Sequence, residues 1–303
     1  MPCYKPITGF RSRTLNASGK RSIVFSVTEG YADLPVTLPC GRCVGCRLEY
    51  SRQWAIRCFH EASLHEQNCF ITLTYSESNL PEGGTLVLAH FQKFMKRLRK
   101  KYPHKKIRFF HCGEYGDLNN RPHYHACIFN HSFDDQQPFQ KQNNVMLYIS
   151  EQLQSLWLYG FASVGDVTFE SAAYVARYIM KKVNGKPATG HYTNLIVDET
   201  TGELLSTNPI KPEYVTMSRR PGIASDWFKK YKTDVYPDDF IVIDNKKMRP
   251  PKFYDNLYEN LHSEHYEQIK YDRIQNSESI SSRRLDDMHQ CKLASISNLP
   301  RNI

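Results

Sequence analysis

The 303-residue sequence lacks several features that would place it in other protein classes. It has no run of about 18 apolar residues, so no transmembrane span is expected. The opening stretch MPCYKPITGF holds no apolar core of a secretion signal, so export is not expected either. Neither an internal repeat nor a sharp domain linker is visible. What remains is a chain long enough for one large globular domain or two modest ones.

Acidic residues are in short supply. The chain has 31 Asp and Glu against 40 Lys and Arg, which gives a formal net charge of +9. Such an excess favours a polyanionic partner, of which nucleic acid is the simplest. Many basic proteins bind no nucleic acid, so charge alone leaves both interpretations open. A hydrophobic content of 40%, with 19 Tyr and 16 Phe, indicates a globular protein.

The nine cysteines are an odd number in a chain without an export signal. We therefore interpret them as reduced cytosolic thiols, some of them able to bind metal. Cys40, Cys43 and Cys46 are separated by two-residue gaps, which let thiolates converge on one ion. The predicted ion is a structural Zn²⁺, and the alternative is three free cysteines in a loop.

Three thiolates do not complete a tetrahedral zinc site. Cys3 is the first candidate for the fourth ligand, and Cys58 is the second. An iron–sulfur run would need a cysteine at position 50, where the chain has Tyr50, so this cluster type is not expected.

Apolar spacing predicts an α+β fold. Helices are predicted over residues 48–65, 90–101, 145–159 and 170–182, and from residue 224. Short apolar runs rich in β-branched residues predict strands over residues 69–75, 107–116, 123–129 and 161–169. A short turn joins the second and third of these strands, which predicts an antiparallel hairpin.

The remaining stretches carry weaker signals. Residues 1–50 are expected to be irregular apart from a short hairpin within 23–38. Residues 131–145 are expected to form a loop, and residues 276–303 a loose tail. The predicted domains are a Cys-rich segment (1–60), a core (61–235) and a C-terminal extension (236–303).

Two histidines stand one residue apart in the stretch RPHYHACIF. Side chains alternate along a strand, so His123 and His125 leave one face and Tyr124 leaves the other. Glu114 lies near the turn of the predicted hairpin, within reach as a third metal ligand. Two imidazoles and a carboxylate suit Mn²⁺ or Mg²⁺ with open positions, and zinc suits this use less well.

Basic side chains are the candidates for contacts to DNA. Helix 90–101 has one apolar and one basic face, and the basic run continues through residues 105–108. A solvated helix face is the alternative interpretation. The candidate residues are Lys96, Arg97, Lys100, Arg219 and Arg220. Trp227 is interpreted as a core residue rather than a stacking platform.

Helix 170–182 carries Tyr174 and Tyr178 on one face, one turn apart, followed by Lys181 and Lys182. Alone, such a pair is more simply explained by packing. A tyrosine hydroxyl has a pKa of ~10, so it attacks a phosphodiester only when the phosphate is made electrophilic. A metal ion on the two histidines would do this as a Lewis acid. The product would be a 5′-phosphotyrosine and a free 3′-hydroxyl, and the reverse reaction would rejoin the strand.

The blocks CFITLTY, GEYG…RPHYHACIF and YVARYIMKK, in this order, resemble the three motifs of HUH-superfamily rolling-circle replication initiators. The stretches PCGRCVGCRLEYSRQWAIRC and MSRRPGIASDWF look like the replication initiators of small single-stranded DNA phages, the gokushovirus branch of the Microviridae. The resemblance covers roughly residues 35–230.

The resemblance implies an antiparallel sheet of about five strands flanked by helices, with a metal on the sheet and the tyrosine helix packed across it. The third metal ligand varies across the superfamily, so Glu170 is an alternative to Glu114. The positions that match the motifs are His123 and His125 for the paired histidines, Tyr174 and Tyr178 for the two tyrosines, and Lys181 or Lys182 for an assisting lysine.

The predicted function is origin-specific nicking and joining of single-stranded DNA, with Mn²⁺ or Mg²⁺, to start and finish rolling-circle replication of a phage genome. The expected location is the host bacterial cytoplasm, and the expected partners are origin DNA and a host helicase and polymerase. One alternative is a non-catalytic, zinc-containing nucleic-acid-binding protein. A second alternative, an iron oxygenase with two histidines and one carboxylate, fits the HYH spacing poorly.

Overall fold

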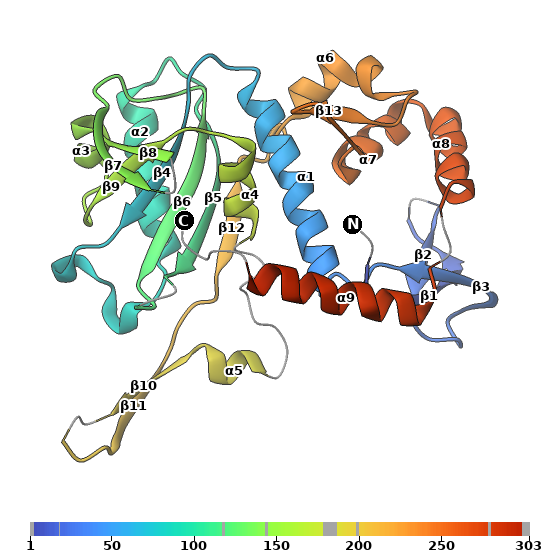
Figure 1. Ribbon diagram of the computed structural model, residues 1–303, viewed down its shortest axis with the longest axis horizontal. Coiled ribbons are helices and arrows are strands. Elements are labelled where there is room, and N and C mark those ends of the chain that lie inside the picture. The colour runs from blue at the N-terminus through green and yellow to red at the C-terminus, as the bar shows by residue number, and fades with distance from the viewer. Residues whose placement is uncertain are drawn as a thin grey trace. The chain divides into compact units, whose positions relative to one another are not determined.

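A computed structural model of the chain describes residues 3–17, 19–116, 119–142, 145–177, 187–197, 200–277 and 280–298. These residues divide into two compact units (Figure 1). Unit 1 contains the described residues up to Tyr50 and those from Asn276 onward, and unit 2 contains Ser51–Gln275. Whether the three predicted segments fold as domains stays a prediction. No helix in the described ranges is long and apolar enough to cross a membrane.

Unit 1 contains a three-stranded antiparallel sheet and a helix that comes from the far end of the sequence. The sheet order is β2-β1-β3, and the elements are β1 (Ile7–Leu15), β2 (Arg21–Val24), β3 (Gly30–Leu38) and α9 (Ser282–Ser297). The predicted hairpin within 23–38 is wrong, because β2 and β3 each pair with β1 and not with each other. The predicted loose tail is also wrong, since α9 is helical and its Leu285 packs beside Tyr4 and Cys43.

A seven-stranded antiparallel sheet organises unit 2, with the order β12-β5-β6-β4-β9-β8-β7. Its strands are β4 (Asn68–Thr74), β5 (Arg108–Tyr115), β6 (Pro122–Phe129), β7 (Gln137–Gln142), β8 (Val145–Ile149), β9 (Ala162–Gly165) and β12 (Tyr214–Met217). The α+β class is confirmed, and so is the hairpin of the second and third predicted strands, β5 and β6. The expected number of about five strands is corrected to seven.

The helices of unit 2 are α1 (Val44–Ala62, which begins in unit 1), α2 (Leu88–Lys101), α3 (Glu151–Leu156), α4 (Phe169–Arg177), α5 (Pro187–His191), α6 (Ser225–Val235), α7 (Lys252–Leu261) and α8 (Ser263–Gln275). The described part of unit 2 also contains two hairpins, β10 (Thr193–Val197) with β11 (Leu204–Pro209) and β13 (Ile241–Ile243) with β14 (Lys246–Met248), and two short 3₁₀ turns, η1 (Glu77–Asn79) and η2 (Glu82–Gly84).

The two faces of the large sheet have separate cores. On β6, Tyr124 belongs to the core formed with α2 and α3, whereas Cys127 belongs to the core formed with α1 and α4. Alternation along the strand therefore sends His123 and His125 toward the α1 and α4 side. This is the face that the sequence pattern predicted for the pair, opposite to Tyr124.

His131 is a buried histidine whose charge state bears on stability. Its ring lies against Tyr102 and Phe133, and within the described residues neither ring nitrogen has a hydrogen-bond partner. Burial lowers the pKa of His131 to about 4, so the folded state binds fewer protons than the unfolded state between pH 4 and 6.5. Stability should therefore fall as the pH is lowered through this window.

We expect His131→Phe to remove this acid sensitivity. The difference in unfolding free energy between the variant and the wild type should shift in favour of the variant by up to about 2 kcal/mol between pH 8 and pH 5. The reason is that the unfolded variant has no histidine at this position to take up a proton. Urea unfolding at the two pH values measures the effect. The exposed His104 supplies the control, and an equal gain in His104→Phe would contradict the assignment.

Candidate active site

Strand register brings three predicted metal ligands together on one face of the sheet. Glu114 on β5 pairs directly with His123 on β6, and Cys112 pairs with His125. Because strands β5 and β6 are joined by a short connection, the two histidines and the carboxylate meet near the turn of the hairpin. These three residues are grouped closely enough to hold one metal ion.

The ligand atoms converge on one carboxylate oxygen. Oε1 of Glu114 lies 2.8 Å from Nε2 of His123 and 2.9 Å from Nε2 of His125. The carboxylate is buried, with 1% of its side chain exposed, and the His123 side chain is 17% exposed. The site is thus accessible mainly from the side of His123.

Hydrogen bonds fix the orientation of both imidazoles. Nδ1 of His123 lies 3.0 Å from the carbonyl oxygen of Arg121, which can only accept, so this nitrogen carries the proton. Nδ1 of His125 lies 3.0 Å from Oγ1 of Thr72, its partner on β4. Such outer contacts hold metal-binding histidines in place.

This arrangement fits a cation between the ligands. In neutral His123 the second nitrogen, Nε2, presents a lone pair to an oxygen that also presents a lone pair, so a proton or a cation must lie between them. Ligand atoms on adjacent positions of an octahedral ion, at about 2.1 Å from it, lie about 3.0 Å apart. The observed spacings of 2.8 and 2.9 Å match that requirement.

The charge state of Glu114 suits the same role. Burial by itself would raise the pKa of this carboxyl, but hydrogen bonds from His123 and His125, in the state in which each Nε2 carries a proton, outweigh burial and lower the pKa to about 2. Glu114 is therefore ionised at every pH at which the protein would work. A buried carboxylate that stays ionised is a suitable ligand for a hard divalent cation.

Helix α4 places Tyr174 beside this group. The rings of Tyr174 and His125 meet edge to face with 5.1 Å between centroids, and Phe70 on β4 lies 6.4 Å from the Tyr174 ring. The half-buried Tyr174 is thus adjacent to a residue of the metal group. Of the predicted tyrosine pair, Tyr174 thus lies next to the predicted metal group.

Local contacts hold α4 in this position. Thr168 caps the start of the helix: its Oγ1 accepts from the Ser171 backbone N–H at 3.1 Å, and Oγ of Ser171 accepts from the Thr168 backbone N–H at 2.8 Å. On the helix itself, the carbonyl of Ala173 accepts a 2.9 Å hydrogen bond from Oγ of Ser51 on α1. Tyr174 is therefore anchored through its neighbour in the chain.

Three of the predicted catalytic residues, Tyr178, Lys181 and Lys182, lie outside the described residues. Their roles stay predictions. Glu170, the alternative third ligand, is exposed in the first turn of α4 and is not a member of the metal-binding group. The geometry thus favours Glu114 as the third ligand.

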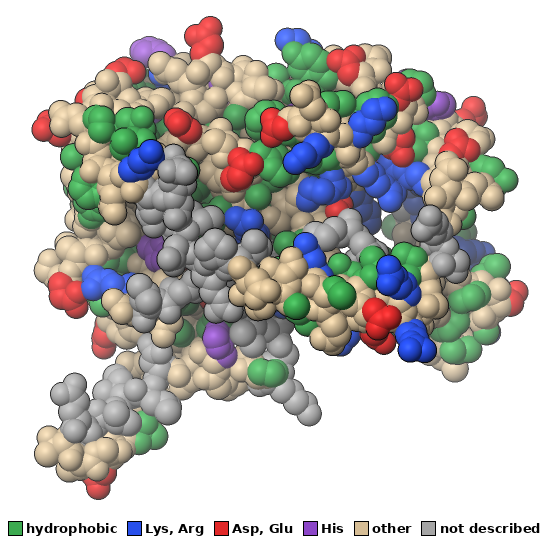
Figure 2. Space-filling model, viewed as in Figure 1, with side chains coloured by type: hydrophobic (Ala, Val, Ile, Leu, Met, Phe, Trp, Pro, Cys, Tyr) green, Lys and Arg blue, Asp and Glu red, His purple; other side chains and the backbone are tan. Residues whose placement is uncertain are grey.

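The predicted DNA contacts differ in how they are presented. Lys96 and Lys100 are exposed on α2, whereas Nε of Arg97 donates to the backbone oxygen of Leu156 at 2.9 Å and helps to hold α3. Trp227 stacks on His60 at 3.5 Å between centroids, which agrees with the core position expected for it. Lys and Arg side chains are visible on the face in Figure 2, several of them where α1, α6 and α7 lie in Figure 1.

A second metal-binding group lies in unit 1 and consists of Cys3, Cys40, Cys43 and Cys46. All four are free thiols. The sulfur atoms of Cys43 and Cys3 are 3.9 Å apart, and those of Cys40 and Cys46 are 4.0 Å apart, too far for a disulfide. Thiolates on a tetrahedral zinc ion, about 2.3 Å from the metal, lie about 3.8 Å apart, so the spacing fits.

Backbone amides point at these sulfur atoms. The amide of Cys40 donates to Cys3, the amide of Cys43 donates to Cys40, and the amide of Tyr4 donates to Cys43, at 3.2, 3.3 and 3.4 Å. Burial would raise the pKa of Cys43, but backbone hydrogen bonds outweigh it and lower the pKa to about 6. Cys58, the second choice for the fourth ligand, is instead buried in the core of unit 2.

Sequence reasoning missed the supporting residues Thr72, Phe70 and Ser51. Thr72 stands at an alternate position of the strand CFITLTY, and such a polar residue in an apolar strand was a usable signal. Ser51 carried no such signal, because its partner Ala173 lies 122 residues away.

Comparison with known proteins identifies the chain. Residues 68–183, which include the metal group and Tyr174, match the family model of replication-associated protein ORF2/G2P. Replication-associated protein VP4 of Bdellovibrio phage phiMH2K is 32% identical over 284 residues, covering 90% of this chain and 81% of the relative. Replication-associated protein ORF2 of Spiroplasma virus 4 is 33% identical over 236 residues, which cover 74% of this chain and 68% of the relative.

A third relative, replication-associated protein ORF4 of Chlamydia phage 1, is 30% identical over 235 residues, which cover 75% of this chain and 55% of the relative. No solved structure matches the chain. The first two relatives align over most of both chains, and the family model falls on the segment that holds the metal group, Tyr174 and the strands of the large sheet other than β12. The chain therefore belongs to the phage replication-associated proteins, the Microviridae-type replication initiators that its motifs resemble.

Proposed function

We propose that this protein nicks and rejoins single-stranded DNA at a phage replication origin, as an HUH-type initiator of rolling-circle replication. The observation that carries the proposal is the contact of Tyr174 with His125, because it places a candidate nucleophile beside a candidate metal ligand. The names of the relatives, all replication-associated proteins of phages or viruses, support the biological setting.

The chemistry assigns one task to each group. Glu114, His123 and His125 would hold Mn²⁺ or Mg²⁺, which supplies Lewis-acid polarisation of a DNA phosphate. Oη of Tyr174 attacks the phosphorus, and the bond between phosphorus and the 3′-oxygen breaks as the new bond forms. The phenol loses its proton and the departing 3′-oxygen gains one, so the step needs no net proton and no water.

The covalent 5′-phosphotyrosine conserves the phosphodiester bond in another form. A free 3′-hydroxyl can therefore attack it and restore the strand without an external energy source. The outer contacts of Thr72 and the Arg121 carbonyl keep the imidazoles in their binding orientation through both steps. Tyr178, proposed as the second nucleophile, would allow a second cleavage while the first strand end is held.

The four cysteines of unit 1 are proposed to hold a structural Zn²⁺. We place the activity in the host cytoplasm, with origin DNA as substrate and host helicase and polymerase as partners. Proteins that carry out a nicking step alone would depend on such partners to unwind and copy the circle.

The test is formation of a DNA–protein adduct. End-labelled single-stranded fragments that tile the phage genome are incubated with the protein and Mn²⁺ or Mg²⁺, then separated on denaturing gels. We expect one fragment to form an adduct with the wild type. Tyr174→Phe should lower adduct formation at least about tenfold, and Tyr174→Phe with Tyr178→Phe should abolish it, because phenylalanine offers no nucleophile.

Tyr271→Phe is the matched control, since Tyr271 is an exposed tyrosine on α8 far from the site in sequence. It should leave adduct formation unchanged. A double variant that still forms adduct would exclude both tyrosines as nucleophiles. Absence of adduct with every fragment and both metals would favour the non-catalytic nucleic-acid-binding protein instead.

A further inference from the structure

A short loop between β12 and α6 presents two neighbouring arginines. We call Ser218–Ala224 (sequence SRRPGIA) the arginine loop. The side chains of Arg219 and Arg220 are exposed, and no hydrogen bond or ion pair to them is found within the described residues. Two exposed cations side by side repel each other, so the conformation of this loop must be held by other contacts.

Both ends of the loop are attached to the protein core. At the start, the Ser218 amide donates to the carbonyl of Phe109 at 3.0 Å, and the Phe109 amide donates to Oγ of Ser218 at 3.1 Å. At the end, Ala224 adopts the left-handed conformation, with φ of 63°, and its amide donates to Oε2 of Glu61 at 2.6 Å. A side chain at Gly222 would come within 2.9 Å of the Phe253 ring, so this close approach requires glycine.

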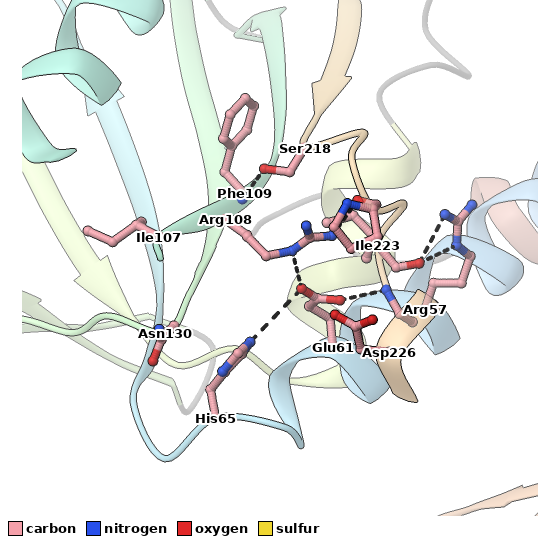
Figure 3. A network of polar contacts seen from close by, with 12 residues as sticks. Arg57, Glu61, His65, Ile107, Arg108, Phe109, Asn130, Ser218, Ile223 and Asp226 are labelled. Carbon is pink, nitrogen blue, oxygen red and sulfur yellow. Dashed lines mark hydrogen bonds and ion pairs between the residues drawn. The ribbon is translucent and has the colours of Figure 1, made fainter. Parts of the chain in front are cut away.

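The middle of the loop is held by two further arginines (Figure 3). Nη2 of Arg108 donates to the carbonyl of Pro221 at 2.8 Å. Nε and Nη2 of Arg57, on α1, donate to the carbonyl of Ile223 at 3.2 and 3.0 Å. Arg108 also forms a buried ion pair with Glu61. Three charged side chains on α1 and β5 thus hold the backbone of one loop.

The energetics indicate that this network fixes geometry. Glu61 and Arg108 are 3% and 6% exposed, and the desolvation of such a pair offsets most of its attraction. Beyond the ion pair, Oε2 of Glu61 and Nη2 of Arg108 are directed at the loop backbone. The backbone of a loop fixed in this way loses little conformational entropy when the exposed side chains bind a ligand.

The loop lies on the large sheet at a distance from the metal group. Arg108 and Glu114 are six residues apart on β5, which corresponds to about 20 Å along an antiparallel strand. A ligand that contacts both positions must therefore be long. A DNA strand that passes the metal group satisfies this condition, and the net charge of +9 favours it.

We propose that the arginine loop binds backbone phosphates of the single-stranded DNA substrate, and that Glu61, Arg108 and Arg57 are positioning residues for it. The inference rests on the proposed function, since it assumes a DNA substrate. Guanidinium groups bind phosphate through paired hydrogen bonds, so two preorganised arginines are suited to this ligand. The contact is independent of base sequence and adds affinity.

The experiment measures binding of fluorescein-labelled dT30 to the full chain by anisotropy, without added Mn²⁺ or Mg²⁺, over a series of salt concentrations. Arg219→Ala with Arg220→Ala should weaken binding about tenfold or more. The slope of log affinity against log salt should decrease in magnitude by about 1.4, because each lost phosphate contact on a single strand contributes about 0.7. Lys246→Ala with Lys247→Ala, on β14, is the control with the same loss of charge.

Equal affinity and slope in the two double variants would overturn the proposal, since net charge would then explain the effect. Absence of dT30 binding by the wild type would overturn this proposal, because the proposed phosphate contacts do not depend on base sequence. Failure of the loop proposal alone leaves adduct formation by the wild type intact, which separates the two.

The Glu61→Gln variant tests the positioning role, because it removes a negative charge whereas the arginine variants remove positive charges. Removal of a negative charge should strengthen binding if only net charge matters. If Glu61 positions the loop, binding should weaken at least about threefold, because Arg108 loses its ion-pair partner. Thermal unfolding of each variant checks that it is folded, and tighter binding by folded Glu61→Gln would contradict the positioning role.

Discussion

Replacement of His123 or His125 by alanine is expected to lower metal-dependent cleavage at least about 10²–10³-fold, the range found when one group that stabilises transition-state charge is removed. The reason is that both Nε2 atoms converge on one oxygen of Glu114, so each histidine would supply a ligand to the same ion. Among the described residues, no other group that could hold a metal ion includes any of these three residues. Glu114→Gln should have a similar effect, since it removes the charge and keeps the shape. Single-turnover cleavage with Mn²⁺ measures the loss, and calorimetry measures Mn²⁺ affinity.

Binding of single-stranded DNA should change less than about twofold in these variants, because the proposed phosphate contacts come from other residues. The control is His104→Ala, which removes an exposed histidine after α2. If His123→Ala cleaves at the wild-type rate, the metal is held elsewhere. If DNA binding and thermal stability fall together with cleavage, the histidine pair has a structural role.

Much of this site could be anticipated from short stretches of sequence. The alternation of His123 and His125 on a strand requires only local geometry. The short turn after β5 sets the register that pairs Glu114 with His123, so the ligand triad also follows from neighbouring residues. The position of Tyr174 against His125 required more, because it depends on how α4 packs across the sheet. For that step the resemblance to a known family supplied what periodicity could not.

The edge of the large sheet shows where periodicity fails. The run VMLYI is apolar and short, so it suits a strand or a helix equally, and the prediction of one helix over residues 145–159 is wrong for this run. Ser150 separates the two: its Oγ accepts from the Leu153 amide at 3.0 Å and starts α3, while Val145–Ile149 forms β8. Strand β7, which pairs with β8, contains Pro138, a residue that a strand tolerates only at a sheet edge.

Unit 1 was harder to predict for a different reason. Strand β1 has a mostly exposed surface with no apolar alternation, so it gave no strand signal. Helix α9 buries only Leu285, and its contacts with Tyr4 and Cys43 cross more than 240 residues of sequence. Local patterns carry no information about contacts of this kind. The cysteine spacing was the one reliable indication that this part of the chain is organised.

Removal of zinc from the cysteine group is expected to unfold unit 1. Among the described residues of unit 1, the buried hydrophobic side chains are few (Tyr4, Cys43 and Leu285), so the hydrophobic core is too small to stabilise the unit alone. Binding of a structural zinc ion contributes about 10 kcal/mol or more to folding in small domains of this kind. Cys43→Ser should therefore lose the bound zinc and expose unit 1 to protease, while unit 2, which has its own cores, stays folded.

Zinc content by mass spectrometry and limited proteolysis measure the two effects. Cys291→Ser is the matched control, because Cys291 is an exposed cysteine on α9 and lies outside the metal group. It should keep one zinc per chain and the wild-type protease pattern. A Cys43→Ser chain that keeps its zinc and resists protease would show that unit 1 folds without this site, and the spacing of the four sulfur atoms would then need another explanation.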